Sequence, residues 1–373
     1  MKWSFTIAKL FGTRVQIHLT FLLLLVFVAA QYYFASGAEA AVRGVFLIIS
    51  VFFCVLLHEF GHVAAALKYG ITTPKITLYP IGGIASLTRI PKKPLQELVV
   101  AAAGPAVNLT IALIIVLIRG NVPTIPAEGV LTAGFSIVDA LFWVNASLFF
   151  FNLIPAFPMD GGRMFRALLG LFLSRGTATH LAVTVGQVIA IAGAIWAMSN
   201  GQILLTFIAA FIFLAGKGEE TMVDQELLLE GHTAGEAGMS DFKTFHLDDK
   251  LNKVIDKILE GDQDVFPVIN DLKDCIAAIS FNEVIAAIQH YGPDAHVRDA
   301  VNSVPEQIPE STPAFDAWQK LARSRMAGAA VVDEAGHLKK WLTNRQFSEF
   351  MVVQALAGHK PERSLRAAAT EEI

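Results

Sequence analysis

The sequence has little charge, and the charge that it has is unevenly placed. Only 17% of the 373 residues are charged, whereas 54% are hydrophobic. Soluble globular domains carry about 25% charged residues, so this composition is typical of a protein with a membrane region. The shortage lies between residues 17 and 215, and the chain from Lys217 onward has the charge density of a soluble protein. We therefore expect a membrane part followed by a soluble part.

Cysteine is scarce, and no strong excess of one charge is present. The two cysteines, Cys54 and Cys275, fall in different parts of the chain, which excludes a disulfide framework and indicates reduced thiols. The formal net charge of -4, without a clustered basic face, excludes nucleic acid from the expected partners. A clear cleavage site is also lacking after the apolar run that starts at Ile17, so we interpret that run as a retained first span.

Six apolar segments come close to the length that a membrane-crossing helix needs. A bilayer core of roughly 30 Å requires about 20 apolar residues in a helix. The six segments are 17–35, 44–67, 95–118, 131–151, 181–198 and 203–216. Lys and Arg gather on the side that holds both ends of the chain, with only Arg43 and Arg119 on the other side. By the positive-inside rule, we expect a multi-pass protein of the cell (inner or plasma) membrane with both termini cytoplasmic.

Two stretches at membrane depth are not predicted to be plain helices. Residues 71–90 contain β-branched residues around Pro80 and the pair Gly82-Gly83, which predicts a re-entrant β-hairpin. Residues 152–162 contain two prolines and two glycines, which must break the fourth span. Broken backbone inside a membrane is tolerated where protein or a water-filled cavity satisfies it, so such breaks often mark a site.

The soluble part contains an internal duplication. Val268-Ile269-Asn270-Asp271, followed by Ile279-Ser280-Phe281-Asn282-Glu283, recurs as Val331-Val332-Asp333-Glu334 followed by Trp341-Leu342-Thr343-Asn344-Arg345-Gln346. Each copy is predicted to hold strands and amphipathic helices, which gives a tandem α+β pair. The predicted fold is thus a mainly α membrane protein with six transmembrane helices and a re-entrant β-hairpin, followed by this soluble pair. The expected divisions are a membrane domain at 1–216, a linker at 217–235, two repeats at 236–292 and 293–357, and a flexible tail at 358–373.

The motif His58-Glu59-Phe60-Gly61-His62 lies within the second span. The two histidines are four residues apart, so both imidazoles project from one face of a helix and can hold one tetrahedral Zn²⁺. Glu59 lies about 100° round the helix, where it can act as general base on a metal-bound water. The alternative is a hydrogen-bonded pair of buried histidines with an incidental Glu. Three ionisable groups within five residues of a span are costly, which favours the metal.

A catalytic zinc needs a third protein ligand, and Asp160 is the leading candidate. It lies in the broken stretch between Pro158 and Gly161, where the backbone can bend towards another helix. Asp160 could instead cap a helix that begins near Arg163. His18 and His180 are competing ligands, and both are expected at the membrane interface.

Other polar residues have two interpretations each. Asn152 could hold a substrate backbone or an oxyanion, or it could bind carbonyls that the break sets free. We interpret Asn108 as a residue that helps two helices to pack. Cys54 could face the metal, but we interpret it as a small buried apolar side chain. Gly82 and Gly83 belong to a strand that could pair with an unwound substrate by strand addition, or to a plain structural loop.

The HEFGH motif together with the run from Asn152 to Arg163 resembles the site-2 protease family of intramembrane metalloproteases. The resemblance extends over residues 1 to about 216 and includes the run from Gly12 to His18 and Gly104-Pro105. It implies that His58, His62 and Asp160 bind one zinc ion, that Glu59 activates water, and that Asn152 contacts substrate. Family members cleave a membrane-anchored protein within or next to its transmembrane helix, often releasing a regulator of transcription.

The tail resembles a tandem pair of cystathionine-β-synthase (CBS) domains, as in the six-span subgroup of site-2 proteases. Such pairs commonly bind adenine nucleotides through a Thr or Ser followed three residues later by an Asp. Here Ser280 is followed by Glu283 and Thr343 by Gln346, so neither copy has the Asp. Ser280, Glu283 and Thr343 are nevertheless the nucleotide candidates that the resemblance implies. A homodimer through the CBS domains and a regulatory protein partner are further expectations.

The leading functional hypothesis is a zinc endopeptidase that cuts a transmembrane segment of a membrane-anchored regulatory protein and is gated by cytoplasmic CBS domains. One alternative is a CBS-regulated channel or transporter, in which His58, His62 and Asp160 bind the ion. The other is a pseudo-protease that binds membrane partners without cutting them. Retention of the general base together with the third ligand argues against the pseudo-protease.

Overall fold

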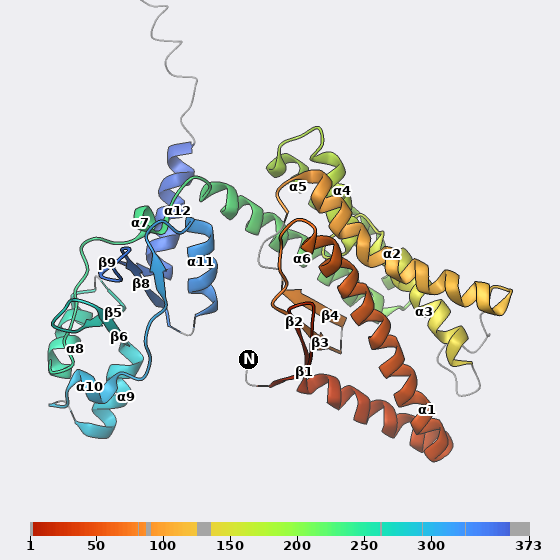
Figure 1. The fold of residues 1–373 in the computed structure, drawn as a ribbon, viewed down its shortest axis with the longest axis horizontal. Helices are drawn as coiled ribbons and strands as arrows, with labels where there is room; N and C mark the ends of the chain where they lie inside the picture. Colours follow the sequence, from red (N-terminus) through yellow and green to blue (C-terminus); the bar gives the residue numbers. More distant parts are fainter. Residues whose placement is uncertain are drawn as a thin grey trace, which may run out of the picture. The chain divides into compact units, whose positions relative to one another are not determined.

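A computed structural model describes residues 3–80, 82–86, 91–124, 136–261, 263–292, 294–324 and 326–358 of the chain (Figure 1). The chain divides into two compact units, Met1–Thr221 and Met222–Ile373. The predicted tail at 359–373 lies outside the described residues.

The first helix, α1 (Leu19–Leu67), holds 49 residues and is broken once. Ser36 and Gly37 leave the helical conformation, and Gly37 has a φ of 84°, which glycine adopts without steric cost. The two arms pack together beyond this bend, because a Cβ atom on Gly44 would lie 2.7 Å from Cδ2 of Tyr32. The bend, visible in Figure 1, joins the predicted first and second spans.

Four other helices of the first unit follow the predicted apolar segments with changed ends: α2 (Pro94–Arg119), α3 (Ile137–Asn152), α5 (Arg175–Ser199) and α6 (Ile203–Leu228). The short helix α4 (Asp160–Leu169) lies between two of these segments. In the part of the chain that the structure describes, α1, α2 and α5 are long and apolar enough to cross a membrane, and α3 is apolar but shorter. The predicted fourth span begins at 131–135, outside the described residues. Helix α6 continues past Gly216, where the predicted span ends, because the polar residues that follow include strong helix formers such as Glu219 and Glu220.

A four-stranded sheet lies against α1. Its order is β1-β2-β3-β4, with strands β1 (Ser4–Leu10), β2 (Thr13–His18), β3 (Lys75–Tyr79) and β4 (Gly82–Ser86). Strands β2 and β3 run parallel, with Val15 opposite Ile76, and the outer pairs are antiparallel. Ile76 and Leu78 pack against Phe21 and Phe52 of α1. The sheet therefore attaches the β3-β4 hairpin to the helix that carries the HEFGH motif.

Strands β1 and β2 were not predicted from the sequence. Residues 4–16 lie before the first span predicted at 17–35, and β2 extends into that span as far as His18. The structure makes a tight turn at Phe11 and Gly12, which have φ values of 49° and 80°. The alternation of apolar and polar residues on both sides of this turn is the signal that indicates a hairpin.

The second unit contains the predicted duplication. The first copy holds α8 (Leu251–Leu259), β5 (Val265–Ile269), β6 (Cys275–Ser280) and α9 (Phe281–Tyr291). The second holds α11 (Ala314–Arg323), β8 (Gly328–Val332), β9 (Leu338–Thr343) and α12 (Asn344–Gly358). In each copy, a preceding segment pairs in parallel with the first strand. In the second copy this segment is β7 (Gln307–Pro309), which pairs with β8, and in the first copy it is a single bridge from Phe245 to Val268.

The two copies exchange their leading segments. The short helix α7 (Ala234–Ala237) packs in the core of the second copy, and α10 (Val297–Ala300) packs in the core of the first. Main-chain bonds join Met239 to Trp341 in the same exchange. Each core therefore includes residues from both sides of the repeat boundary predicted at 292/293.

Trp341 joins the two copies. Its side chain is fully buried in a cluster that combines Val265 and Cys275 of the first copy with Ala330 of the second. Its indole Nε1 donates a hydrogen bond of 2.8 Å to the carbonyl oxygen of Val265. This bond is buried, and the same carbonyl oxygen also accepts a hydrogen bond of 2.8 Å from Nε2 of Gln263.

Replacing Trp341 by Phe removes this hydrogen bond and part of a buried ring, so it should destabilise the second unit by about 1–3 kcal/mol. The measurement is pulse proteolysis of the full chain across a urea series, scored on the second unit. Trp318→Phe is the control, because Trp318 is only partly buried beside Phe315. Equal midpoints for W341F and W318F would contradict this role of Trp341.

Candidate metal centre

The second arm of α1 brings His58 and His62 together on one helix face. Their Nε2 atoms lie 3.1 Å apart, and His58 is buried. The spacing of four residues places both rings over the same side of the helix, as expected from the helical period. Two of the three predicted ligands thus come from one rigid element.

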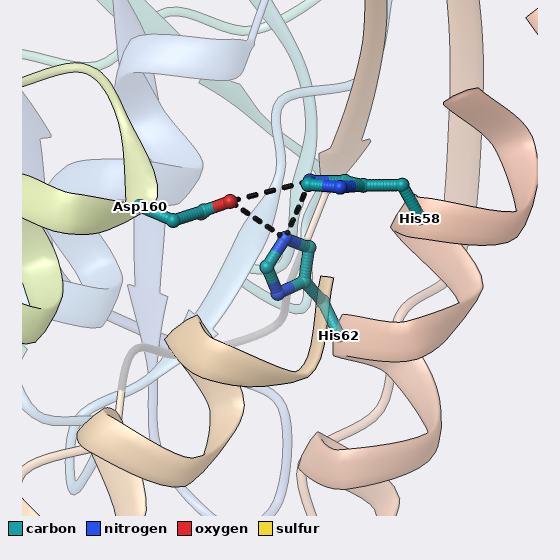
Figure 2. A group of neighbouring side chains, drawn as sticks. All are labelled: His58, His62 and Asp160. Carbon is teal, nitrogen blue, oxygen red and sulfur yellow. Dashed lines mark hydrogen bonds and ion pairs between the residues drawn. The ribbon is translucent and has the colours of Figure 1, made fainter. Parts of the chain in front are cut away.

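Asp160 completes the group from a different segment. It is the first residue of α4, and its Oδ2 lies 3.2 Å from Nε2 of His58 and 3.3 Å from Nε2 of His62 (Figure 2). The N-cap of α4 is Met159, and no side chain caps this end. The alternative in which Asp160 caps a helix is therefore wrong, because its carboxylate faces the two imidazoles.

The turn before α4 can reach the histidines because it is built closely around two glycines. A Cβ atom on Gly161 would lie 2.4 Å from the carbonyl oxygens of Leu153 and Ile154, and one on Gly162 would lie 2.7 Å from the carbonyl carbon of Ala156. No side chain fits at these distances. The Gly161-Gly162 pair thus lets the chain fold back on itself after Asn152 and present Asp160 to α1.

Helix α2 orients both histidines from behind. Nδ1 of His62 lies 2.7 Å from the carbonyl oxygen of Val100, and Nδ1 of His58 lies 2.5 Å from Oδ1 of Asn108. A carbonyl oxygen only accepts hydrogen bonds, so Nδ1 of His62 is the donor and the neutral ring presents its lone pair on Nε2. The same assignment for His58 follows from its Asn108 partner.

Asn108 is a functional residue that the sequence analysis treated as helix packing. Its Nδ2 donates a hydrogen bond of 2.8 Å to Oδ1 of Asn145, whose Nδ2 donates in turn to the carbonyl oxygen of Leu141. This chain of bonds leaves Oδ1 of Asn108 directed at His58. The signal in the sequence is an amide one helical turn after Gly104 in a mostly apolar helix.

Two glycines allow α1 and α2 to approach this closely. A Cβ atom on Gly61 would lie 2.6 Å from the carbonyl oxygen of Ala103. A Cβ atom on Gly104 would lie 2.3 Å from Nε2 of His62 and 2.7 Å from Nε2 of His58. The absence of a side chain at Gly104 thus leaves room for the imidazoles.

The three ligand atoms have the spacing that a metal ion requires. Tetrahedral Zn²⁺ with bonds of about 2.0–2.1 Å separates its ligand atoms by roughly 3.3–3.4 Å. The separations here are 3.1, 3.2 and 3.3 Å. Two imidazole nitrogens and a carboxylate that converge away from water form a set of ligand atoms that suits a cation. Among the described residues, His58, His62 and Asp160 form the cluster that can hold a metal.

Both competing ligand candidates form hydrogen bonds elsewhere in the structure. Nδ1 of His18 is 2.8 Å from Oγ1 of Thr20 at the start of α1, and Nδ1 of His180 is 2.6 Å from Oε1 of Glu220. Cys54 is buried on α1 and is not part of the cluster.

Glu59 stands beside the β4 strand. A Cβ atom on Gly83 would lie 2.9 Å from Cγ and 3.2 Å from Oε1 of Glu59. Gly82, next to it, has a φ of 133°, a conformation that side chains rarely adopt. The glycine pair thus brings backbone, rather than side chains, up to the general-base candidate.

The remaining predicted site residues lie at helix ends and form hydrogen bonds there. Nδ2 of Asn152 donates a hydrogen bond of 2.9 Å to the carbonyl oxygen of Leu148 within α3. Glu283 accepts hydrogen bonds from the backbone and hydroxyl of Ser280 in a capping box at the start of α9. Oγ1 of Thr343 accepts from the backbone N–H of Gln346 at the start of α12. The substrate and nucleotide roles of these residues stay predictions.

Comparison with known proteins identifies the family. The model of peptidase family M50 matches residues 46–134 and 125–193, which include the HEFGH motif and Asp160. The chain belongs to this family. It is a zinc metalloprotease of the site-2 protease type.

Similar proteins cover both units. A zinc metalloprotease of Methanocaldococcus jannaschii is 28% identical over 339 residues, which cover 91% of this chain and 93% of the relative. The solved site-2 protease from M. jannaschii is 32% identical with a TM-score of 0.43, over 58% of this chain and 95% of that one. A CBS-pair protein from Arabidopsis thaliana is similar at 18% identity with a TM-score of 0.31, over 34% of this M50 chain and 98% of that one.

The close approach at Gly104 gives a direct prediction. Replacing Gly104 by Ala puts a methyl group against both Nε2 atoms, so the purified protein should lose most of its zinc. Metal analysis of the purified full chain is the measurement. Gly193→Ala is the matched control, since that α5 glycine has open space where its Cβ would lie. Zinc content in G104A equal to that of G193A would contradict the close packing.

The bond between Asn108 and His58 gives a second prediction. Asn108→Leu removes the acceptor that orients the ring, and loss of such a partner typically weakens metal affinity about 10–100-fold. The zinc dissociation constant, measured by chelator competition, reports the change. Thr110→Val on the same helix is the control, because Oγ1 of Thr110 donates its hydrogen bond to the Ala106 carbonyl of α2 itself. We expect wild-type affinity in T110V, and equal affinities in both variants would refute the role of Asn108.

Proposed function

We propose that this M50 protease hydrolyses a peptide bond in or next to the transmembrane segment of a membrane-anchored regulatory protein. The observation that carries the proposal is the convergence of His58, His62 and Asp160 on one point, with both histidines on α1, a helix apolar enough to cross a bilayer. The proposed setting is the cell membrane, with six spans, a re-entrant hairpin and both termini in the cytoplasm.

The proposed roles follow from the geometry of the side chains. His58, His62 and Asp160 would hold one zinc ion as its protein ligands. When bound, zinc supplies Lewis acidity, which lowers the pKa of a water molecule towards neutrality and polarises the substrate carbonyl. Glu59 takes a proton from the attacking water and passes it to the amine of the leaving peptide.

The proposed substrate path runs along β4. This strand is at the edge of the four-stranded sheet. Among the described residues, no strand pairs with its outer side, so a further strand could form hydrogen bonds there. Gly83 of β4 lies against Glu59. An unwound segment that pairs with this edge would pass the general base in an extended conformation, as proteolysis requires.

Asn152 is proposed to contact the substrate from the other side. Its Nδ2 is engaged with Leu148, and among the described residues its Oδ1 accepts no hydrogen bond. The carbonyl oxygen can therefore accept from a backbone N–H of the substrate. Nδ2 also has a second N–H, which could donate to an oxyanion, so both interpretations of Asn152 stay open.

The second unit is proposed to be a regulatory CBS pair. The tandem copies with exchanged leading segments support a single functional body, which could also form a homodimer or bind a regulatory protein. An adenine nucleotide is the ligand proposed for Ser280, Glu283 and Thr343. Because the carboxylate of Glu283 is used by the capping box, a nucleotide would have to displace that bond.

Replacing Glu59 by Gln should reduce cleavage of a co-expressed single-span substrate by at least about 100-fold, because the general base is lost. The zinc content should stay at the wild-type level, since Glu59 is not among the three ligands. Fragment masses from the purified protein, with and without a zinc chelator, measure the cleavage.

Glu39→Gln is the control for a neutral change elsewhere on α1, where Glu39 pairs with Arg43 on the surface. Cleavage by E59Q at the rate of E39Q would remove Glu59 from the mechanism. Ion flux through the purified wild-type protein in liposomes, without proteolysis, would instead support a channel.

A further inference from the structure

Arg166 is a buried charge six residues after Asp160 on the same short helix. Only 1% of its surface is exposed, and its guanidinium makes three hydrogen bonds to two carboxylates. Burying an unpaired guanidinium is costly, so these bonds decide where α4 can lie. The guanidinium also stands 5.0 Å from the ring of Phe157, in the turn that leads to Asp160.

One side of this network is fixed to the metal centre. Nε and Nη2 of Arg166 donate to Oε1 of Glu97 at 2.9 and 2.5 Å. Glu97 belongs to α2, the helix whose Val100 and Asn108 orient the two histidines. The bond to Glu97 therefore ties the helix that carries Asp160 to the helix that supports the other two ligands.

The other side of the network leads to α6. Nη1 of Arg166 donates to Oε1 of Glu219 at 2.8 Å. Helix α6 is otherwise loosely packed, because its buried residues are Ala209, Gly216 and Val223 and most of its side chains are exposed. A loosely packed helix can shift at low cost, since few apolar contacts oppose the movement.

Helix α6 also continues beyond the first unit. It runs without a break to Leu228, past the division between Thr221 and Met222. The next residue, Leu229, is buried in a hydrophobic core of the second unit. The helix that carries Glu219 therefore runs directly into the chain of the second unit.

We propose that the Arg166–Glu219 ion pair couples α6 to α4 and so sets the position of Asp160 relative to His58 and His62. Arg166 acts as a positioning residue, and the pair is the point at which the second unit controls the metal centre. This inference rests on the proposed zinc ligands and on the proposed regulatory role of the second unit.

The test compares two neighbouring glutamates of α6 in the full chain, in lipid nanodiscs. Glu219→Gln removes the charge that pairs with Arg166 and leaves the bond to Glu97. Glu220→Gln is the matched control, because Glu220 pairs instead with Lys217 and with the exposed His180. The readouts are the zinc dissociation constant and the hydrogen exchange of α4 amides in the zinc-free protein.

We expect E219Q to weaken zinc binding about 10-fold and to speed exchange in residues 160–169, as loss of a supporting partner does. E220Q should leave both within about twofold of wild type, because exposed ion pairs contribute little. A merely structural Glu219 would lower the yield of folded protein without changing its zinc affinity. If E219Q does not accumulate, Glu219→Asp keeps the charge on a shorter side chain, and the same order of affinities is expected.

Equal zinc affinity and exchange in the Glu219 variant, E220Q and wild type would overturn the coupling while leaving the protease intact. Failure of the wild-type chain to bind zinc would instead overturn the metal site on which the inference rests. The two failures are therefore distinguished by the wild-type measurement alone.

Discussion

Three acceptor atoms converge in a part of the molecule where water is scarce, and the rest of the first unit is arranged around that convergence. Nε2 of His58, Nε2 of His62 and Oδ2 of Asp160 lie 3.1–3.3 Å from one another. Without a cation, these lone pairs and the carboxylate would repel one another in a medium of low dielectric constant. With a cation bound, the same convergence holds α1 and α4 together.

The surrounding glycines and amides follow from this constraint. Gly61 and Gly104 let α1 and α2 approach, so that α2 can bind the outer nitrogen of each imidazole. Gly161 lets the turn after α3 carry Asp160 back towards α1. Fixed ring orientations leave little entropy to be lost when the metal binds, which is the advantage of a pre-organised site. Helices α1 and α2 also expose large apolar side chains, such as Phe53 and Leu113.

Much of this centre could be predicted from the sequence, because its information is local. The spacing of His58 and His62 is a property of one helix, and the prolines and glycines around Asp160 indicate a break wherever they occur. Asn108 could not be assigned to His58, since that contact depends on how two helices pack. Strands β1 and β2 were missed because their weak alternation lies beside a strong apolar run. The exchange of α7 and α10 between repeats is likewise a tertiary effect that no local pattern encodes.

The most direct test of the central claim is X-ray absorption at the zinc edge on the purified full-length protein. The geometry predicts a first shell of nitrogen and oxygen atoms at about 2.0–2.2 Å, with two imidazole rings visible in the outer shells. A sulfur shell at about 2.3 Å, or a single imidazole, would contradict the assignment of His58, His62 and Asp160 as the zinc ligands.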